Sequence, residues 1–417
     1  MITAALLGAG SRGMHAYGTY ALERPNEIKF VAVAEPDDTK RKMFAEAHNI
    51  PKENQFKSWT ELLEKPKLAE ALLICTQDRE HYVPTMKALD LGYDILLEKP
   101  MSPDPKESLE MAEKAEETDQ VLTICHVLRY STFFMKLKEI IEDKDSVGDI
   151  MTIEWTENVG YYHQAHSFVR GNWRDSEESS SMLLQKSCHD MDLIQWLLEE
   201  QCKKVSSFGS LSYFREEYAP AGAGERCIDC AIEQDCPYSA LKWYYNDKNQ
   251  WPVNTVEPTG DLKKRLKAIE EGRYGVCVYR SDNNVVDHQV VNLEFESGAT
   301  VAFTMSAFTK EQGRTFQIGT TKAEITGSTL TNEIRVKYYT GEEVLVYPEQ
   351  VTGGHGGADT LIMRDFVKQI KDKSYETKTS AMESAKSHLI VFAAEESRET
   401  DQTILMDDYI ETLRKRG

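Results

Sequence analysis

The first 125 residues alternate short apolar runs with segments of helical periodicity. The apolar runs have the length of strands and lie at 2–7, 29–34, 71–75, 93–97 and 121–125. Helical patterns follow the glycine-rich turn after the first run and recur at 38–48, 79–91 and 103–116. Strands that alternate with helices predict βαβ units and a parallel sheet, and continuous apolar strands indicate that helices cover both faces. We therefore expect an α/β domain over 1–125.

From about residue 150 the pattern changes to an alternation of apolar and polar positions. It is clearest at 151–155, 290–295, 300–308, 316–319 and 334–339. This period predicts an antiparallel or mixed sheet with one exposed face. Helices are expected at 186–199, 358–371 and 381–398, within a second α+β domain over 126–417. Residues 215–280 are irregular and rich in Cys, Pro and Tyr, which indicates an insertion.

Size and charge narrow the classes of function. A chain of 417 residues is too long for one ordinary core, and its net charge of −20 opposes binding to nucleic acid. No apolar run reaches the roughly 18 residues of a membrane span, and no signal peptide pattern opens the chain. We therefore expect a cytoplasmic protein with no membrane partner. An exposed sheet face often pairs with a copy of itself, so a homo-oligomer is also expected.

A glycine motif links the first strand to the first helix. Residues 8–13 read GAGSRG, with glycines at Gly8, Gly10 and Gly13. In this context the motif predicts a Rossmann turn that binds a dinucleotide pyrophosphate at a helix N-terminus; the alternative is a plain connecting turn. Glu35 ends the second strand, where a carboxylate binds the ribose hydroxyls and repels a 2′-phosphate. NAD is favoured, and NADP is the alternative because Lys40 and Arg41 lie nearby.

Several further motifs follow in order along the chain. They are AEPD at 34–37, CTQDREH at 75–81, EKP at 98–100, NWRD at 172–175, CHDMDLIQWL at 188–197, HGGAD at 355–359 and AAEESR at 393–398. Together with the glycine motif, they resemble the Gfo/Idh/MocA oxidoreductase family. The resemblance implies a second domain with a large, open, mostly antiparallel sheet. It also implies hydride transfer between a nicotinamide and a sugar or polyol carbon.

The resemblance assigns roles to particular residues. Lys99 matches the lysine that contacts the reacting hydroxyl, and His189 matches the proton-transfer histidine. The cofactor contacts that it implies are Gly8, Gly10, Ser11, Arg12, Gly13, Glu35, Thr76, Glu98, Lys99, Trp173 and Arg174. One departure matters, because the family commonly has an aspartate where this chain has Gln185, followed by Lys186. An amide cannot take up a proton, so the relay must differ.

Residue types alone support these roles less strongly. Lys99 follows a strand at the edge where open α/β sheets place ligands. The same residues are equally typical of a surface lysine before a turn proline. His189 could be a structural histidine at the start of a helix. The candidate substrate contacts are His126, Arg129, Tyr130, Tyr161, Tyr162, His163, His166 and Gln185. Their aromatic and imidazole rings suit stacking on a sugar, and they equally suit an ordinary aromatic loop.

The cysteines of the irregular region form a second motif. Cys227, Cys230 and Cys236 have the spacing C-x₂-C-x₅-C, which in a cytosolic protein predicts a thiolate metal site. We expect structural zinc, with Cys277 as the first choice for the fourth ligand and Cys202 or a histidine as alternatives. An iron–sulfur cluster is the other metal centre considered, and plain reduced thiols are the structural alternative.

These observations predict an NAD(P)-dependent dehydrogenase or reductase that acts on a small carbohydrate. Two alternatives stay open. One is a glycosidase that oxidises a sugar hydroxyl transiently with bound NAD. The other is a nucleotide or sugar sensor without turnover. The replacement of the family aspartate by Gln185 is compatible with this alternative.

Overall fold

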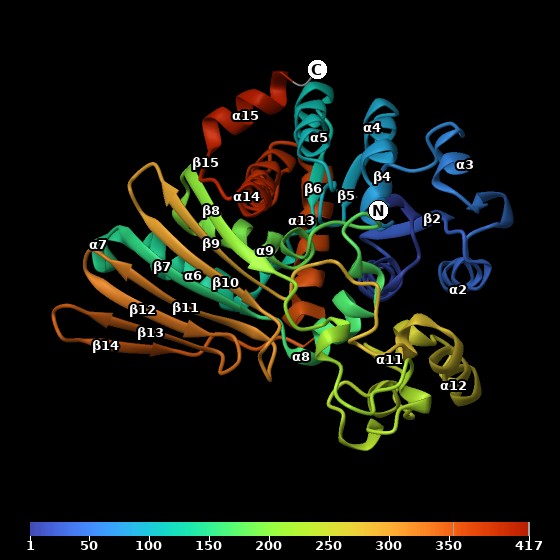
Figure 1. The fold of residues 1–417 in the computed structure, drawn as a ribbon. Coiled ribbons are helices and arrows are strands. Elements are labelled where there is room, and N and C mark those ends of the chain that lie inside the picture. Colours follow the sequence, from blue (N-terminus) through green and yellow to red (C-terminus); the bar gives the residue numbers. More distant parts are fainter. Residues whose placement is uncertain (353, 416–417) are drawn as a thin grey trace.

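The computed structural model describes residues 1–352 and 354–415. The chain forms two sheets that lie beside each other (Figure 1). The first has six parallel strands in the order β3-β2-β1-β4-β5-β6. Their bounds are β1 Ile2–Leu7, β2 Ile28–Ala34, β3 Gln55–Phe56, β4 Ala71–Ile74, β5 Asp94–Leu97 and β6 Leu122–Ile124. This is the Rossmann strand order, with its switch point between β1 and β4.

Helices connect these strands, and polar residues fix where the helices begin. The helices are α1 Thr19–Glu23, which continues a π-helical turn over Arg12–Gly18, α2 Asp38–His48, α3 Trp59–Leu63, α4 Tyr82–Asp90 and α5 Pro105–Thr118. The Asp37 side chain accepts hydrogen bonds from the first backbone N–H groups of α2. Asp104 does the same for α5, which has proline in its first turn. The parallel sheet predicted from the apolar runs is confirmed.

The second sheet has nine strands in the order β14-β13-β12-β11-β7-β10-β9-β8-β15. Neighbours are antiparallel except β7 and β10, which are parallel. The strands are β7 Ile150–Asn158, β8 Cys202–Ser210, β9 His288–Phe295, β10 Thr300–Ser306, β11 Gly313–Thr320, β12 Ala323–Ser328, β13 Glu333–Tyr338, β14 Glu343–Val346 and β15 Ile404–Leu405. Buried and exposed residues alternate along β9, so the predicted half-exposed sheet is confirmed.

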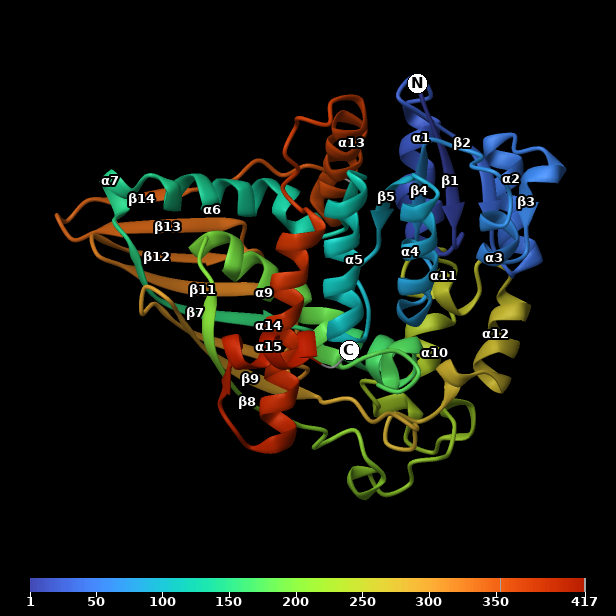
Figure 2. The same ribbon diagram turned by 90° about the horizontal axis from the view of Figure 1, so that it is seen from above.

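One face of this sheet packs on helices through a large apolar core. The helices are α6 Thr132–Glu142, α9 Met182–Leu198 and α14 Ala381–Thr400 (Figure 2). Helix α14 and the preceding α13, Ala358–Lys371, also reach the parallel sheet, because Ile362, Phe366 and Ala385 belong to its core clusters. The C-terminal helices therefore join the two sheets. The remaining C-terminal helix is α15, Met406–Lys415.

The predicted insertion lies between β8 and β9. It contains only short helices, α10 Ala240–Tyr244, α11 Val253–Val256 and α12 Leu262–Glu271, joined by irregular loops and 3₁₀ turns. In both views α11 and α12 lie beside the first sheet and its helices (Figures 1 and 2). The short helices α7 Lys144–Val147 and α8 Tyr161–His163 flank β7. Among the helices described, none is long and apolar enough to cross a bilayer.

Candidate functional site

The glycine turn after β1 has a different steric reason for each glycine. Gly8 has a φ of +87°, and a Cβ there would lie 2.5 Å from the backbone oxygen of Cys75. A Cβ on Gly13 would lie 2.3 Å from the backbone oxygen of Gly8, so this glycine allows the helix to pack closely on the strand. A Cβ on Gly10 would meet nothing within 4 Å. The space at Gly10 is where a pyrophosphate approaches the backbone in this type of turn, so the turn fits a dinucleotide.

Glu35 lies against the same turn. Its carboxylate accepts hydrogen bonds from the backbone N–H of Ala9, at 2.8 Å, and of Asp37, at 3.0 Å. The side chain is buried at the end of β2. Carboxylate oxygens can accept further hydrogen bonds, so these contacts orient Glu35 and leave it able to receive ribose hydroxyls. Ser11 is exposed at the start of the first helical turn, and the Thr76 hydroxyl donates to the backbone oxygen of Glu80.

Arg12 joins the turn to distant parts of the chain. Its guanidinium donates to Glu98 at 2.6 Å and to Asp359, at the start of α13, at 2.8 Å. The Tyr17 hydroxyl also donates to Glu98. Burial alone would raise the pKa of Glu98, but the adjacent Arg12 charge and the Tyr17 hydrogen bond keep it below its ordinary value. Glu98 therefore stays ionised and holds the loop that carries Lys99.

Lys99 crosses from the first sheet to helix α9 of the second domain. Its Nζ donates to the backbone oxygen of Gln185 at 2.6 Å. Gln185 and His189 lie four residues apart on α9, on one face of the helix. The structure therefore brings Lys99 to the turn of α9 that leads to His189, which is itself buried.

A carboxylate lies next to Gln185, although residue 185 is not itself an aspartate. The Gln185 amide donates to the Asp78 carboxylate and, at 2.9 Å, to the hydroxyl of Ser180. Asp78 is buried, and burial raises its pKa in spite of the nearby charges of His81 and Lys99. Sequence reasoning did not assign a role to Asp78, although it lies within the CTQDREH segment.

Three histidine rings, those of His189, His126 and His388, contact one another in sequence. The His126 ring is 5.6 Å from that of His189 and 5.3 Å from that of His388, measured between centroids. Burial lowers the pKa of His388 to about 3 and places that of His126 well below its ordinary value. Both rings are therefore neutral at pH 7. Asp192, which is held by Arg129 at 2.7 Å, lies 3.7 Å from His126.

A buried charge network supports α9 from the sheet. Lys186 and Arg314 each lie 3.0 Å from the Glu157 carboxylate, and Arg314 is 2.7 Å from Asp190. The indole of Trp155 donates to Asp190 at 2.9 Å. Sequence reasoning missed this network, in which two cations and two anions compensate one another. Removal of one partner from such a buried set is costly, so the network fixes the position of α9.

The predicted aromatic contacts divide into two groups. Tyr161 packs on Tyr238 and Trp243, and His166 accepts or donates a hydrogen bond with the Tyr244 hydroxyl at 3.0 Å, so both contact the insertion. His163 lies nearer the Lys99 contact. Burial lowers its pKa well below the ordinary value, and the charges of Lys186 and Lys99 add to this effect. The ring of Trp251, from the insertion, lies 5.1 Å from that of His163.

The NWRD segment lies beside this group. Trp173 packs against Phe168 at 5.9 Å between ring centroids, and Phe168 in turn packs against His163 at 5.8 Å. Arg174 forms ion pairs at 2.7 Å with Glu178 and Asp282. These ion pairs fix Arg174 in its loop, and its predicted cofactor contact stays a prediction.

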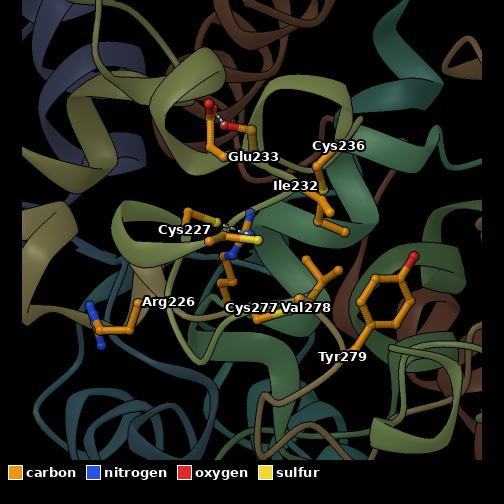
Figure 3. Close-up of a pocket in the computed structure, with 12 residues that line it drawn as sticks. Arg226, Cys227, Ile232, Glu233, Cys236, Cys277, Val278 and Tyr279 are labelled. Atoms are coloured by element: carbon orange, nitrogen blue, oxygen red, sulfur yellow. Dashed lines mark hydrogen bonds between the residues drawn. The ribbon is translucent and has the colours of Figure 1, made fainter. Parts of the chain in front are cut away.

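The four predicted cysteine ligands line one cavity of the insertion (Figure 3). Cys202 is elsewhere, in β8, where its thiol contacts the backbone oxygen of Lys204. Among the residues described, however, no group of three or more His, Cys, Asp or Glu side chains is arranged to hold a metal ion. The predicted zinc site is therefore not supported, although all four cysteines line the same cavity.

Comparison with known proteins extends these observations. Residues 2–126 match the model of the oxidoreductase family NAD-binding Rossmann fold, and residues 138–406 match that of its C-terminal alpha/beta domain. The chain is 24% identical over 341 residues to the putative oxidoreductase YteT of Bacillus subtilis, covering 78% of each. It is 24% identical to the scyllo-inositol 2-dehydrogenase (NAD(+)) of the same organism, over 52% of this chain and 60% of that protein.

Solved structures have the same fold at low identity. An oxidoreductase from Agrobacterium radiobacter, in complex with NAD+, L-tartaric acid and magnesium, aligns with a TM-score of 0.70 and 14% identity over 98% of this chain and 99% of that one. The WlbA dehydrogenase from Chromobacterium violaceum, in complex with NADH and UDP-GlcNAcA, aligns with a TM-score of 0.67 and 15% identity over 97% of this chain and 95% of that one.

Proposed function

The chain belongs to the Gfo/Idh/MocA family of NAD(P)-binding oxidoreductases, and we propose that it transfers hydride between the nicotinamide and a hydroxyl-bearing carbon of a sugar, polyol or glycoside. One observation carries the proposal. Lys99, from the first sheet, contacts the backbone of Gln185 at 2.6 Å, one helical turn before His189. This contact supports the proposal that Lys99 and His189, which come from different domains, handle the hydroxyl proton together.

The roles follow from the chemistry of the side chains. The Lys99 ammonium polarises the reacting hydroxyl, and His189 accepts its proton during oxidation or returns it during reduction. The nicotinamide, when bound, supplies or accepts the hydride. Gln185 cannot relay a proton, but it holds the Asp78 carboxylate by a hydrogen bond. Asp78 therefore replaces the missing family carboxylate as the acidic group beside the Lys99 contact.

The sugar-like substrate class is supported by the side chains around this contact. Trp251 has 42% of its surface exposed and packs edge-on against His163. Tyr162 adds a second ring 6.3 Å from Trp251. Aromatic faces suit the apolar face of a sugar ring, while histidine nitrogens suit its hydroxyls. The names of the inositol dehydrogenase relative and of the UDP-GlcNAcA complex are consistent with this class.

The test is a screen of sugars, polyols and glycosides with NAD and NADP, followed by variants of the two proton-handling residues. Lys99→Ala and His189→Ala should each lower turnover by about 10²-fold or more, the scale of a lost general acid–base contribution. The exposed substitutions Lys42→Ala and His15→Ala serve as controls, with no change expected. Near wild-type turnover in both folded active-site variants would place the proton relay elsewhere.

A second function is favoured by one relative. A 2,7-anhydro-N-acetylneuraminate hydratase of Mediterraneibacter gnavus is 24% identical over 45% of this chain and 48% of that protein. Its name describes a reaction without net oxidation, so the same site could oxidise a glycoside transiently and restore it. Chromatography of the screened products separates the cases. Net formation of NADH supports the dehydrogenase, cleavage or hydration without NADH supports the alternative, and cofactor binding without either supports a sensor.

A further inference from the structure

His126 is a fully buried histidine at the edge of the first sheet where such sheets bind ligands. It comes just after β6, the neighbour of the strand β5 whose end leads to Lys99. Its side chain is 0% exposed, and among the described residues neither ring nitrogen has a hydrogen-bond partner. The ring is neutral, so it has one N–H and one bare nitrogen to satisfy. Buried polar groups are nearly always paired, so an unpaired one here indicates a role other than stability.

Two histidine rings pack against His126, and they differ in what they can offer it. The Nε2 atom of His388 accepts a hydrogen bond from the backbone N–H of Met101 at 3.0 Å. Its Nδ1 donates to the backbone oxygen of Ser384 at 2.7 Å, so both nitrogens of this ring are occupied. The His189 ring lies 5.6 Å from that of His126, between centroids, and is nearly perpendicular to it at 79°. His189 is therefore the neighbour through which His126 can act.

A carboxylate determines which nitrogen of His126 carries the proton. The Nδ1 atom lies 3.7 Å from Asp192 Oδ2, a little beyond hydrogen-bond distance. Arg129 holds Asp192 in place with two hydrogen bonds, of 2.7 and 2.8 Å. The nearby carboxylate favours the proton on Nδ1, which leaves Nε2 as an acceptor. Catalytic hydrogen bonds are often long in the free enzyme and shorten when the substrate binds, so this spacing suits a contact that forms during the reaction.

The charges around the two rings already compensate one another. A proton on His189 therefore adds a buried positive charge with no carboxylate of its own, which is costly unless an acceptor lies beside it. The bare nitrogen of His126 is such an acceptor, because it belongs to a neutral ring that is not engaged elsewhere. The compensated groups are Asp192 with Arg129, Asp190 and Glu157 with Arg314 and Lys186, and Asp78 with the nearby Lys99 and His81.

We propose that His126 is a positioning residue that stabilises the protonated form of His189 during the hydride transfer proposed above, on which this inference rests. When His189 takes the hydroxyl proton, an N–H of its ring donates to Nε2 of His126, and the Nδ1–H of His126 donates to Asp192. The proton from the substrate stays on His189, so His126 itself is never charged. His126 thus makes His189 a stronger base without touching the substrate.

The first test compares the stability of two neighbouring histidines in the full chain. His126→Leu removes two nitrogens that have no partner, so its melting temperature should equal or exceed that of the wild type. His388→Leu is the matched control. It removes a ring with two hydrogen bonds and leaves the Met101 N–H unpaired, so its melting temperature should fall. A fall in His126→Leu as large as that in His388→Leu would show that His126 is a structural histidine, and the proposal would be wrong.

The second test measures the protonation of His189 directly and needs no substrate. The full chain is labelled with nitrogen-15 in its histidines, and the His189 signals are identified by their loss in His189→Gln. In His126→Leu, His189 should lose its proton about one pH unit lower than in the wild type, which is about a tenfold weaker affinity for the proton. His126→Gln, whose amide reaches the place of Nε2, should restore most of the difference, and His126→Asn should not. An unchanged titration of His189 in His126→Leu would overturn the proposal.

The third test uses turnover with a substrate found by the screen. His126→Leu should lower kcat for oxidation by about 3- to 10-fold, because a weaker base removes the proton more slowly, while KM and NAD affinity persist. The acid limb of its pH profile should move to lower pH, since His189 stays neutral further into the acid range. A wild-type kcat and pH profile in His126→Leu would contradict the role of His126 and leave the dehydrogenase function intact. If no substrate is oxidised, the proposed function fails while the titration of His189 still decides the role of His126.

Discussion

Two alanine substitutions in the glycine turn separate cofactor binding from folding. In Gly10→Ala the new Cβ meets no protein atom within 4 Å, so the folded chain has room for it. Replacing glycine by alanine where space and backbone conformation allow it stabilises a protein by about 0.4–1 kcal/mol, because the unfolded chain loses freedom. We therefore expect Gly10→Ala to be at least as stable as the wild type.

Binding of NAD should respond in the opposite direction. The methyl group of Gly10→Ala occupies the space through which the pyrophosphate reaches the backbone. Loss of this close approach should weaken NAD at least tenfold, equivalent to about 1.4 kcal/mol of binding free energy. Titration calorimetry with NAD measures the binding, and thermal denaturation of the same samples measures the stability.

Gly13→Ala is the matched comparison. Its Cβ would lie 2.3 Å from a backbone oxygen, so the helix must shift away from the strand. Overpacking of this kind costs about 1–3 kcal/mol of stability, and NAD binding should be lost with it. If Gly10→Ala binds NAD like the wild type, the pyrophosphate does not lie at this turn. If it is destabilised as much as Gly13→Ala, the steric argument is wrong.

Three further predictions rest on single side chains. Glu35→Ala should narrow the preference for NAD over NADP in titration calorimetry, because it removes the ribose acceptor and a charge that repels the 2′-phosphate; a wild type that prefers NADP would reverse this reasoning. Asp78→Asn should lower kcat by about 10- to 100-fold while NAD affinity persists, and Asn26→Asp, an exposed change just before β2, should leave kcat unaltered. Burial lowers the pKa of His48 to about 4, so between pH 6.5 and pH 4 the unfolded chain binds the extra proton and stability falls as the pH is lowered. Urea denaturation measured across this pH window should show that the unfolding free energy of His48→Asn depends less steeply on pH than that of the wild type, by up to about 1.4 kcal/mol per pH unit. An unchanged slope would show that His48 is protonated in the folded protein.

Some of the site could be predicted from the sequence because neighbouring residues encode it. The steric need for glycine at Gly8 and Gly13 is local to one turn, and the alternation of apolar strands with helices fixes the parallel sheet. The position of Glu35 could be predicted from the same βαβ unit, because this residue lies at the end of the second strand of that sheet. The resemblance to the family added Lys99 and His189, whose motifs lie in the expected order.

Other features could not be predicted, because they depend on contacts between distant segments. Gln185 indicated a missing carboxylate, but only packing shows that Asp78 lies against it. The ion pair between Glu157 and Arg314 joins residues far apart in the chain, so no motif or spacing in the sequence indicates it. The cysteine motif predicted a zinc site, but among the residues described no group of side chains is arranged to hold a metal ion. Spacing along the chain does not determine how the thiols are placed in space.

The sequence by itself thus determined the elements and the chemistry available to them. Periodicity and the φ preferences of glycine act over a few consecutive residues, so they can be read from the chain. Only the tertiary structure decided which groups meet, such as Lys99 with the start of α9, or Arg170 with Cys227. These contacts join residues far apart in the sequence, and they form only because the core packs the two sheets and the insertion against common helices. The physical reason is that side-chain packing, which is not periodic along the chain, fixes their distances.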